Sequence, residues 1–152
     1  MTTVRHLTIG ESQDPHLLPP ELRGHGLPFL DPEWCWVVEH DGQPIALFVS
    51  SFVHGLLVFW RLMATAKAKR VSVNWFLLAF PQILDTVKQR GCVGYMTMLQ
   101  DGRPQEAKLA RMVMRHGGLI EPFSGSLAVR FFPEYVSPEQ VQTIVEQMRK
   151  AG

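Results

Sequence analysis

Three cations lie close together in one short segment of the sequence. Lys67, Lys69 and Arg70 follow an apolar run from Leu56 to Met63 and precede a long amphipathic segment. The apolar run predicts a buried strand, and the amphipathic segment predicts a helix. The first backbone N–H groups of a helix lack intrahelical partners, and the helix dipole favours an anion at that end. The segment therefore predicts a site for a phosphate-bearing ligand, with a solvated basic turn as the alternative interpretation.

Three single titratable residues outside this segment are further candidates. His54, at a predicted turn before the strand, is the best candidate for a general base, with an ordinary turn histidine as the alternative. Asp101 follows a later predicted strand and is placed to accept a proton from an amine, or to cap the loop beside Gly102. Arg61 is the only charge in the apolar run, and it is expected either to point into a cleft or to emerge at a sheet edge.

The sequence carries no signature of a metal site or of a catalytic nucleophile. Its six histidines are scattered, without HxH or HExxH spacing. Cys35 and Cys92 lack CxxC spacing, and we expect them to be buried free thiols. No serine stands in a GxSxG motif.

Size and charge restrict the class of protein. The chain has 152 residues, of which 46% are hydrophobic, and its formal net charge is +1. This predicts one domain over residues 1–152, and it indicates neither nucleic acid nor an anionic membrane as a partner. The N-terminus lacks the layout of a signal peptide, and no window approaches the roughly 18 apolar residues of a membrane span. We therefore expect a cytoplasmic protein.

Hydrophobic periodicity and turn residues predict alternating strands and helices. Asp41-Gly42, extended by Gln43-Pro44, and His54-Gly55 mark two turns that join three antiparallel strands. In chain order, the predicted elements are a strand or arm over 2–9, a weak helix over 16–23, strands over 34–40, 45–52 and 56–63, a helix ending near 90, a strand over 92–99, a helix over 104–116, a strand pair over 119–121 and 127–132, and a C-terminal helix over 137–150.

Two of these helices have clear internal signals. Pro81 is expected to kink the helix after the basic segment, and Gly91 to end it. Ser137 and Gln140 predict a capping box at the start of the C-terminal helix, whose apolar stripe is expected to pack on the domain or on a partner chain. The residues that the first of these helices is expected to bury are Val73, Phe76, Leu77, Phe80, Leu84 and Val87.

This order of elements resembles the fold of the GCN5-related N-acyltransferases (GNAT), over Thr2 to about Phe132. The resemblance implies an α+β fold of the α/β/α type, with a mixed, mostly antiparallel sheet and helices on both faces, to which the C-terminal helix is added. In that family the fourth strand splays from the fifth, acyl-CoA lies in the gap, and the turn after the fourth strand binds its pyrophosphate. By position, Leu56–Met63 is the fourth strand and Ala64–Arg70 is the pyrophosphate turn.

The resemblance also implies ligands and site residues. It implies acetyl-CoA or another acyl-CoA as the cofactor and an amine as the second substrate. The implied cofactor-binding residues are Arg61, Met63, Ala64, Lys67, Ala68, Lys69 and Arg70.

A narrower resemblance rests on Trp60-Arg61-Leu62 followed closely by Lys67-Ala68-Lys69-Arg70. These residues are similar to a segment of the small acyltransferase-like proteins of tailed bacteriophages, a group that includes assembly factors of the T7-type internal virion protein A kind. This resemblance implies a location in a bacterial or phage-infected cell, and a virion protein or a second copy of the chain as partner.

Several residues depart from the acyltransferase pattern. The family's turn has glycines that let backbone N–H groups approach the phosphates, but this chain has no glycine between Gly55 and Gly91. Met114 occupies the position of the tyrosine that often protonates the leaving thiolate, and the strand 56–63 has no carboxylate to serve as a base. Two functions therefore stay open: a degenerate acyl-CoA N-acyltransferase, and a non-catalytic phage or prophage assembly or virion-associated protein.

Overall fold

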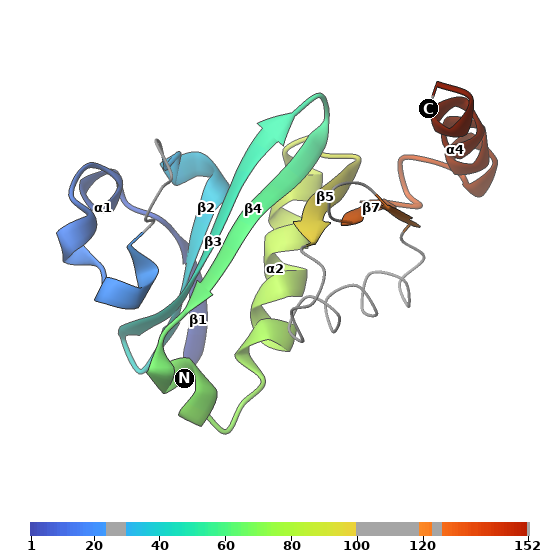
Figure 1. The fold of residues 1–152 in the computed structure, drawn as a ribbon. Coiled ribbons are helices and arrows are strands. Elements are labelled where there is room, and N and C mark those ends of the chain that lie inside the picture. The colour runs from blue at the N-terminus through green and yellow to red at the C-terminus, as the bar shows by residue number, and fades with distance from the viewer. Residues whose placement is uncertain (24–29, 100–118, 123–125, 152) are drawn as a thin grey trace.

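The structure, a computed structural model, describes residues 1–23, 30–99, 119–122 and 126–151. Within that part of the chain, seven strands form one sheet in the order β1-β2-β3-β4-β5-β7-β6 (Figure 1). The strands are β1 (Thr2–His6), β2 (Cys35–His40), β3 (Gln43–Val53), β4 (Leu56–Ala64), β5 (Gly94–Leu99), β6 (Leu119–Pro122) and β7 (Ser126–Phe131). The helices are α1 (Ile9–Gln13), α2 (Trp75–Gln89) and α4 (Pro138–Ala151). The helix predicted over 104–116 lies outside the described residues.

Strand pairing is antiparallel at every neighbouring pair except β4 and β5, which are parallel. Figure 1 shows α1 and α2 on opposite sides of this sheet. The mixed sheet between two helical layers confirms the predicted α+β fold. Among the described residues, no helix combines the length and the apolar character needed to cross a bilayer.

Both predicted hairpin turns are present. Asp41 and Gly42 have φ angles of 50° and 75°, and His54 and Gly55 have φ angles of 48° and 83°. Two consecutive residues with positive φ form the two-residue turn that matches the twist of paired strands. The prediction that Gln43-Pro44 extends the first turn is wrong, because Pro44 already pairs with β2.

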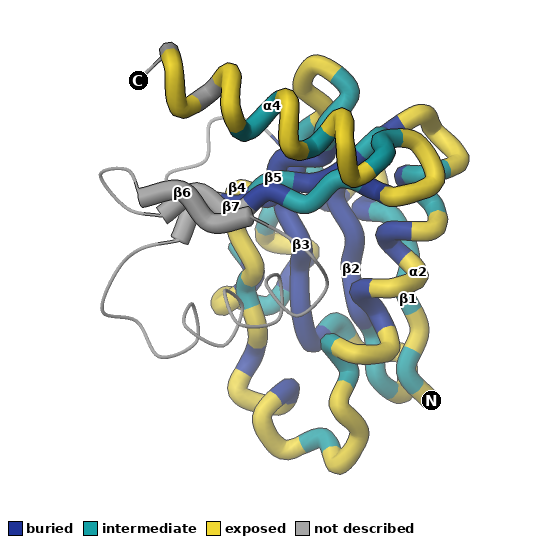
Figure 2. Tube along the Cα trace, turned by 90° about the vertical axis from the view of Figure 1, so that its right-hand side faces the viewer, coloured by how far each residue is buried: buried dark blue, intermediate teal, exposed yellow. Residues whose placement is uncertain are grey.

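Buried side chains form one cluster on each face of the sheet. The cluster between the sheet and α2, here called the α2-side cluster, includes Trp36, Phe48, Phe59, Phe80 and Tyr95. The other, here called the α1-side cluster, includes Leu7, Leu18, Leu22, Leu47 and Val49. Figure 2 shows β2 and β3 as the most continuously buried strands between them. Cys35 and Cys92 are buried free thiols, as predicted.

The N-terminal helix lies earlier in the chain than predicted. The Thr8 hydroxyl accepts from the Glu11 N–H, and the Glu11 carboxylate accepts from the Thr8 N–H, so a complete capping box starts α1. Segment 16–23, predicted as a weak helix, instead contains two short 3-10 turns, Pro15–Leu17 and Pro20–Leu22. Their prolines favour a first helical turn and prevent its extension from the preceding residues.

Helix α2 begins later than predicted. The basic segment Ala66–Arg70 forms a separate 3-10 turn capped by Thr65, and α2 starts only at Trp75, with Asn74 as its N-cap. Gly91, with a φ of 90°, follows its end as predicted. Phe80, Leu84 and Val87 are buried on α2 as predicted, but Val73 and Leu77 are 41% and 59% exposed. Val73 precedes the helix, which explains its departure from the helical pattern.

The start of the C-terminal helix α4 matches its prediction more closely. The Ser137 hydroxyl accepts from the Gln140 N–H at 3.2 Å, and the Gln140 side chain accepts from the Ser137 N–H at 2.8 Å. These two bonds confirm the predicted capping box of α4. Strand β5 begins at Gly94 instead of Cys92.

Gly94 marks the tightest backbone approach in the sheet among the described glycines. A Cβ at this position would lie 2.3 Å from the carbonyl oxygen of Arg130 and 3.0 Å from the Cα of Phe131, both on β7. We expect Gly94→Ala to lower the free energy of unfolding by about 1–3 kcal/mol, because backbone must move to relieve the overlap. Urea denaturation measures this change. Gly10→Ala is the matched control, since its Cβ would meet nothing closer than 3.7 Å. Equal losses of stability for the two variants would contradict this account.

Candidate functional site

The parallel pair of β4 and β5 separates part of the way along β4. Pairing runs from Leu56 opposite Gly94 to Phe59 opposite Thr97, whereas β4 continues to Ala64. At the last pair, the buried Thr97 hydroxyl donates to the Phe59 carbonyl at 3.4 Å. Residues 60–64 of β4 therefore have no partner on β5, although the opposite edge of β4 stays paired with β3. We call the place where this pairing ends the β4–β5 opening.

A β-bulge lies at the same point of the strand. Phe59 pairs with Ser50 and Arg61 pairs with Val49, so Trp60 is an extra residue on β4. A bulge bends its strand and increases the local twist. The bulge therefore accounts for the divergence of β4 from β5 directly after Phe59.

The bulge also determines which way the next side chains point. Phe59 belongs to the α2-side cluster, so Trp60, the next residue, emerges on the opposite face. Arg61 lies opposite Val49, which belongs to the α1-side cluster, and directly opposed residues share a face. Trp60 and Arg61 thus lie on the same face, and Leu62 returns to the α2 side opposite Phe48. Arg61 is exposed on the segment of β4 beyond its last pair with β5, and its cleft position and its edge position both stay predictions.

The predicted phosphate segment follows the end of β4. The Thr65 hydroxyl accepts from the Ala68 N–H at 3.3 Å, which holds residues 66–70 in their 3-10 turn. Lys67 Nζ donates to Gln43 Oε1 at 2.6 Å, and Lys69 and Arg70 are exposed. The structure therefore brings the three cations to one end of β4.

The remaining predicted cofactor residues divide between core and surface. Met63 packs against the α1-side cluster, and Ala68 is buried under the 3-10 turn. Ala64 is exposed at the end of β4. Of this group, Ala64 is the residue that the structure leaves accessible to a ligand beside the cations.

The start of α2 is separate from the cations. The Leu77 N–H donates to Asn74 Oδ1 at 3.3 Å, and the Trp75 N–H donates to the Val73 carbonyl at 2.8 Å. The prediction that the cations stand at the helix N-terminus is therefore wrong. Thr65 and Asn74 each start their own helical segment, so four residues separate Arg70 from α2.

His54 lies at the other end of β4 from the basic turn. The strand between them spans Leu56–Ala64, roughly 26 Å at about 3.3 Å per residue. His54 is exposed at the hairpin tip. The structure does not bring it together with the cations, and its role as a general base stays a prediction. Asp101, the other candidate, lies outside the described residues.

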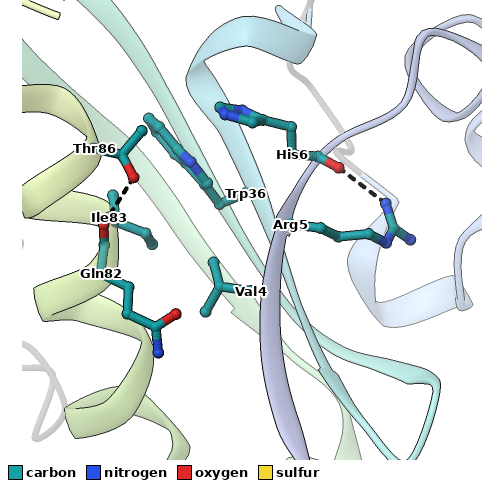
Figure 3. A pocket seen from close by; sticks show the side chains of 7 residues that line it. All are labelled: Val4, Arg5, His6, Trp36, Gln82, Ile83 and Thr86. Atoms are coloured by element: carbon teal, nitrogen blue, oxygen red, sulfur yellow. Dashed lines mark hydrogen bonds between the residues drawn. The ribbon is translucent and has the colours of Figure 1, made fainter. Parts of the chain in front are cut away.

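A small pocket lies elsewhere, between β1, β2 and α2, two strands away from β4 (Figure 3). Its volume is about 110 Å³, and its lining residues are Val4, Arg5, His6, Trp36, Gln82, Ile83 and Thr86. The Arg5 side chain points away from it and forms ion pairs with Glu11 and Glu39, both at 2.7 Å. This pocket is too small for a nucleotide-sized ligand.

His6, on the rim of the pocket, is a titratable contact that the sequence did not indicate. Its Nε2 lies 3.3 Å from Nη2 of Arg90, and its ring packs on Trp36 with centroids 5.3 Å apart. Burial and the positive charge of Arg90 lower the pKa of His6 below its ordinary value of 6.5, and Glu33 opposes them weakly. The two contacting residues are 84 positions apart, so only the tertiary fold shows the pair.

The fold is shared with solved GNAT acetyltransferases. The ribosomal-protein-S18-alanine N-acetyltransferase from Escherichia coli aligns with a TM-score of 0.57 and 10% identity, over 85% of this chain and 91% of the other. The PaiA N-acetyltransferase from Thermoplasma acidophilum, solved in complex with coenzyme A, aligns with a TM-score of 0.62 and 9% identity, over 87% of this chain and 99% of the other. Naa50 from Arabidopsis thaliana, solved with a bisubstrate analogue, aligns with a TM-score of 0.58 and 8% identity, over 86% of this chain and 99% of the other. At such identities the likeness shows the fold alone. No protein-family model and no curated protein matches the chain.

The His6–Arg90 contact predicts a pH dependence of stability. Because the folded state lowers the pKa of His6, the unfolded chain binds a proton at higher pH than the folded chain does. The stabilisation is therefore complete above pH 6.5 and is lost as the pH falls towards the folded-state pKa. We expect His6→Gln to flatten the decrease in stability between about pH 7 and pH 5, measured by urea denaturation. His16→Gln, at an exposed histidine, is the control. An unchanged slope in His6→Gln would contradict the prediction.

Proposed function

We propose that this chain binds acyl-CoA in the β4–β5 opening and transfers the acyl group to an amine slowly. The observation that carries the proposal is the end of the β4–β5 pairing at Phe59 while β4 continues to Ala64. Among the described residues, it leaves the β5-facing edge of residues 60–64 without a strand partner. Solved proteins of this fold support the ligand class, since PaiA was solved with coenzyme A.

The basic turn supplies the phosphate contacts in this proposal. Lys67, Lys69 and Arg70 lie directly after the free segment of β4, where a pyrophosphate would leave the opening. No glycine lies between Gly55 and Gly91, and Ala64, Ala66 and Ala68 each carry a Cβ that hinders close approach of backbone N–H groups to a phosphate. Side-chain cations therefore replace part of the backbone contacts.

The chemistry would depend on positioning and on the strand backbone. The amine nitrogen attacks the thioester carbonyl, a C–N bond forms, the C–S bond breaks, and the electron pair leaves with the thiolate of CoA. An N–H on the free edge of β4 would stabilise the developing oxyanion. The amine loses its proton to solvent, and the thiolate gains one from solvent, because Met114 cannot act as an acid. Loss of a positioned acid typically costs a factor of about 10²–10⁴ in rate.

Calorimetric titration with acetyl-CoA tests the binding proposal. We expect saturable binding in the micromolar range and at least a tenfold weaker dissociation constant, about 1.4 kcal/mol, for the triple variant Lys67→Ala, Lys69→Ala, Arg70→Ala. The reason is the loss of charge-assisted contacts to the phosphates. The matched control is Arg149→Ala with Lys150→Ala, which removes two exposed cations from α4.

Two outcomes would contradict the proposal in different ways. No binding by the wild-type chain at millimolar acetyl-CoA would exclude the cofactor. Binding that is equally tight in the triple variant and in the control would exclude the basic turn as the phosphate site.

The position of α4 favours a second candidate function, a non-catalytic role in assembly or as a virion-associated protein. Figure 1 shows α4 beyond the β7 end of the sheet. Its apolar residues Val141, Ile144 and Val145 are only partly buried, and among the described residues neither core cluster includes them. Such a stripe suits a contact with another chain, including a second copy of this one.

Light scattering over a range of concentrations tests this second function. We expect a mass above the 17.3 kDa of one chain, and a return to that mass in Ile144→Glu, because a buried charge would disrupt an apolar contact. Gln142→Glu, at an exposed position of the same helix, is the control. A monomeric wild-type chain at every concentration would argue against self-association through α4.

A further inference from the structure

Two apolar stripes change from buried to exposed at the level where β4 and β5 stop pairing. On the α2 face of β4, Phe59 is buried, whereas Leu62 is 43% exposed. On α2, Phe80 is buried, whereas Leu77, about one turn earlier in the helix, is 59% exposed. The rings of Phe59 and Phe80 lie 5.7 Å apart between centroids, so both stripes leave the core at the same level.

The exposed ends of the two stripes lie in the same direction. Helix α2 connects the parallel strands β4 and β5, so it runs opposite to both, and its first turn lies beside the end of β4. The step from Phe80 to Leu77 therefore follows β4 beyond its last pair with β5. Phe48 lies between the two leucines. It pairs directly with Leu62, and its ring packs on Phe76, the residue before Leu77, with centroids 5.9 Å apart.

The side of α2 that carries Leu77 faces β5. Gln82 faces β1, where it lines the small pocket (Figure 3). At about 100° per residue, Leu77 lies roughly 140° around the helix from Gln82. Phe80, the i+3 neighbour of Leu77, contacts Tyr95 of β5 with ring centroids 5.4 Å apart. Leu62 and Leu77 thus flank the β4–β5 opening on its α2 side, and we call them the leucine pair.

The proposed ligand carries an apolar group to this place. With its phosphates at the basic turn and its thioester at the opening, acyl-CoA extends beyond the thioester only through its acyl group. The single methyl of an acetyl group is too small to cover two leucine side chains, whereas a longer hydrocarbon chain covers both. Each buried methylene strengthens binding by a factor of about four.

From this arrangement we propose that the chain prefers an acyl-CoA whose acyl group is a hydrocarbon chain longer than acetyl, and that the leucine pair binds this chain. Leu62 contacts the hydrocarbon from the strand, and Leu77 contacts it from the helix. The inference rests on the proposed acyl-CoA function and names the acyl group that this function uses. The preference comes from apolar contact, so it requires no charged group at the opening.

Calorimetric titration of the full chain with acyl-CoAs of increasing length tests the preference. Acetyl-CoA, butyryl-CoA and hexanoyl-CoA share the same phosphates and thioester, and each differs from the one before it by two methylenes. We expect hexanoyl-CoA to bind at least about tenfold more tightly than acetyl-CoA, because the added methylenes become buried. The heat capacity change of binding should become more negative along the series, which is the mark of apolar burial.

Neutral variants locate the residues that bind the hydrocarbon. Leu77→Gln and Leu62→Thr should each lower the ratio of hexanoyl-CoA to acetyl-CoA affinity at least about threefold, because each removes apolar surface. Both should keep the affinity for acetyl-CoA, since neither changes the charge near the phosphates. Leu78→Gln is the matched control, because Leu78 is 45% exposed on the same helix but shares the side of Gln82. It should keep the wild-type ratio, and a thermal melt of each variant reports whether it folds.

The outcomes distinguish this inference from the function on which it rests. If the wild-type chain binds acetyl-CoA and hexanoyl-CoA equally tightly, the preference is overturned and the acyl-CoA proposal stands. If the preference is present but neither leucine variant lowers it, the leucine pair is overturned as its site. If no acyl-CoA binds, both proposals are overturned. A lower ratio in Leu77→Gln and Leu62→Thr, with the wild-type ratio kept in Leu78→Gln, supports the inference.

Discussion

The geometry of the candidate site depends on one extra residue in β4. Trp60 has no counterpart on β3, and the resulting bulge turns β4 away from β5 while its other edge stays paired through Ala64. A strand without the bulge would shift by one residue and exchange the faces of every side chain beyond it. Arg61 would then point towards α2, and Leu62 towards α1. The opening and the direction of the side chains at its mouth therefore have the same origin.

Packing on the α2 side explains why the opening begins where it does. Phe59 contacts Phe80 and Tyr95, with ring centroids 5.7 Å and 6.0 Å apart, so β4, β5 and α2 are held together at this level. Beyond it, Leu62 and Leu77 are 43% and 59% exposed among the described residues. The aromatic core thus fixes β4 to β5 up to Phe59, and the bulge separates the strands at the next residue.

Features with local signals were predictable from the sequence, and features with tertiary causes were not. The Asp41-Gly42 turn and the Ser137 capping box depend on a few adjacent residues, and both were predicted correctly. The capping box of Thr8 and Glu11 had the same kind of signal and was overlooked. The bulge lies in a continuous apolar run, which has no alternation for an extra residue to interrupt. The basic segment was predicted to stand directly at the N-terminus of α2, because Thr65 and Asn74 start two helical segments within ten residues and periodicity alone does not separate them.

The separation of the basic turn from α2 changes how an anion would be held. Cations at a helix N-terminus oppose the helix dipole, but Lys67, Lys69 and Arg70 lie in a turn of their own and do not carry this cost at α2. One of the backbone N–H groups at the start of α2 already has a partner, because Asn74 Oδ1 accepts from the Leu77 N–H. A phosphate arriving there would have to displace the Asn74 side chain, whereas the basic turn offers exposed charges with little competition. Binding that relies on flexible side chains is less precise than binding by a backbone cradle. In the proposed function, this difference implies imprecise placement of the thioester, as expected for slow transfer.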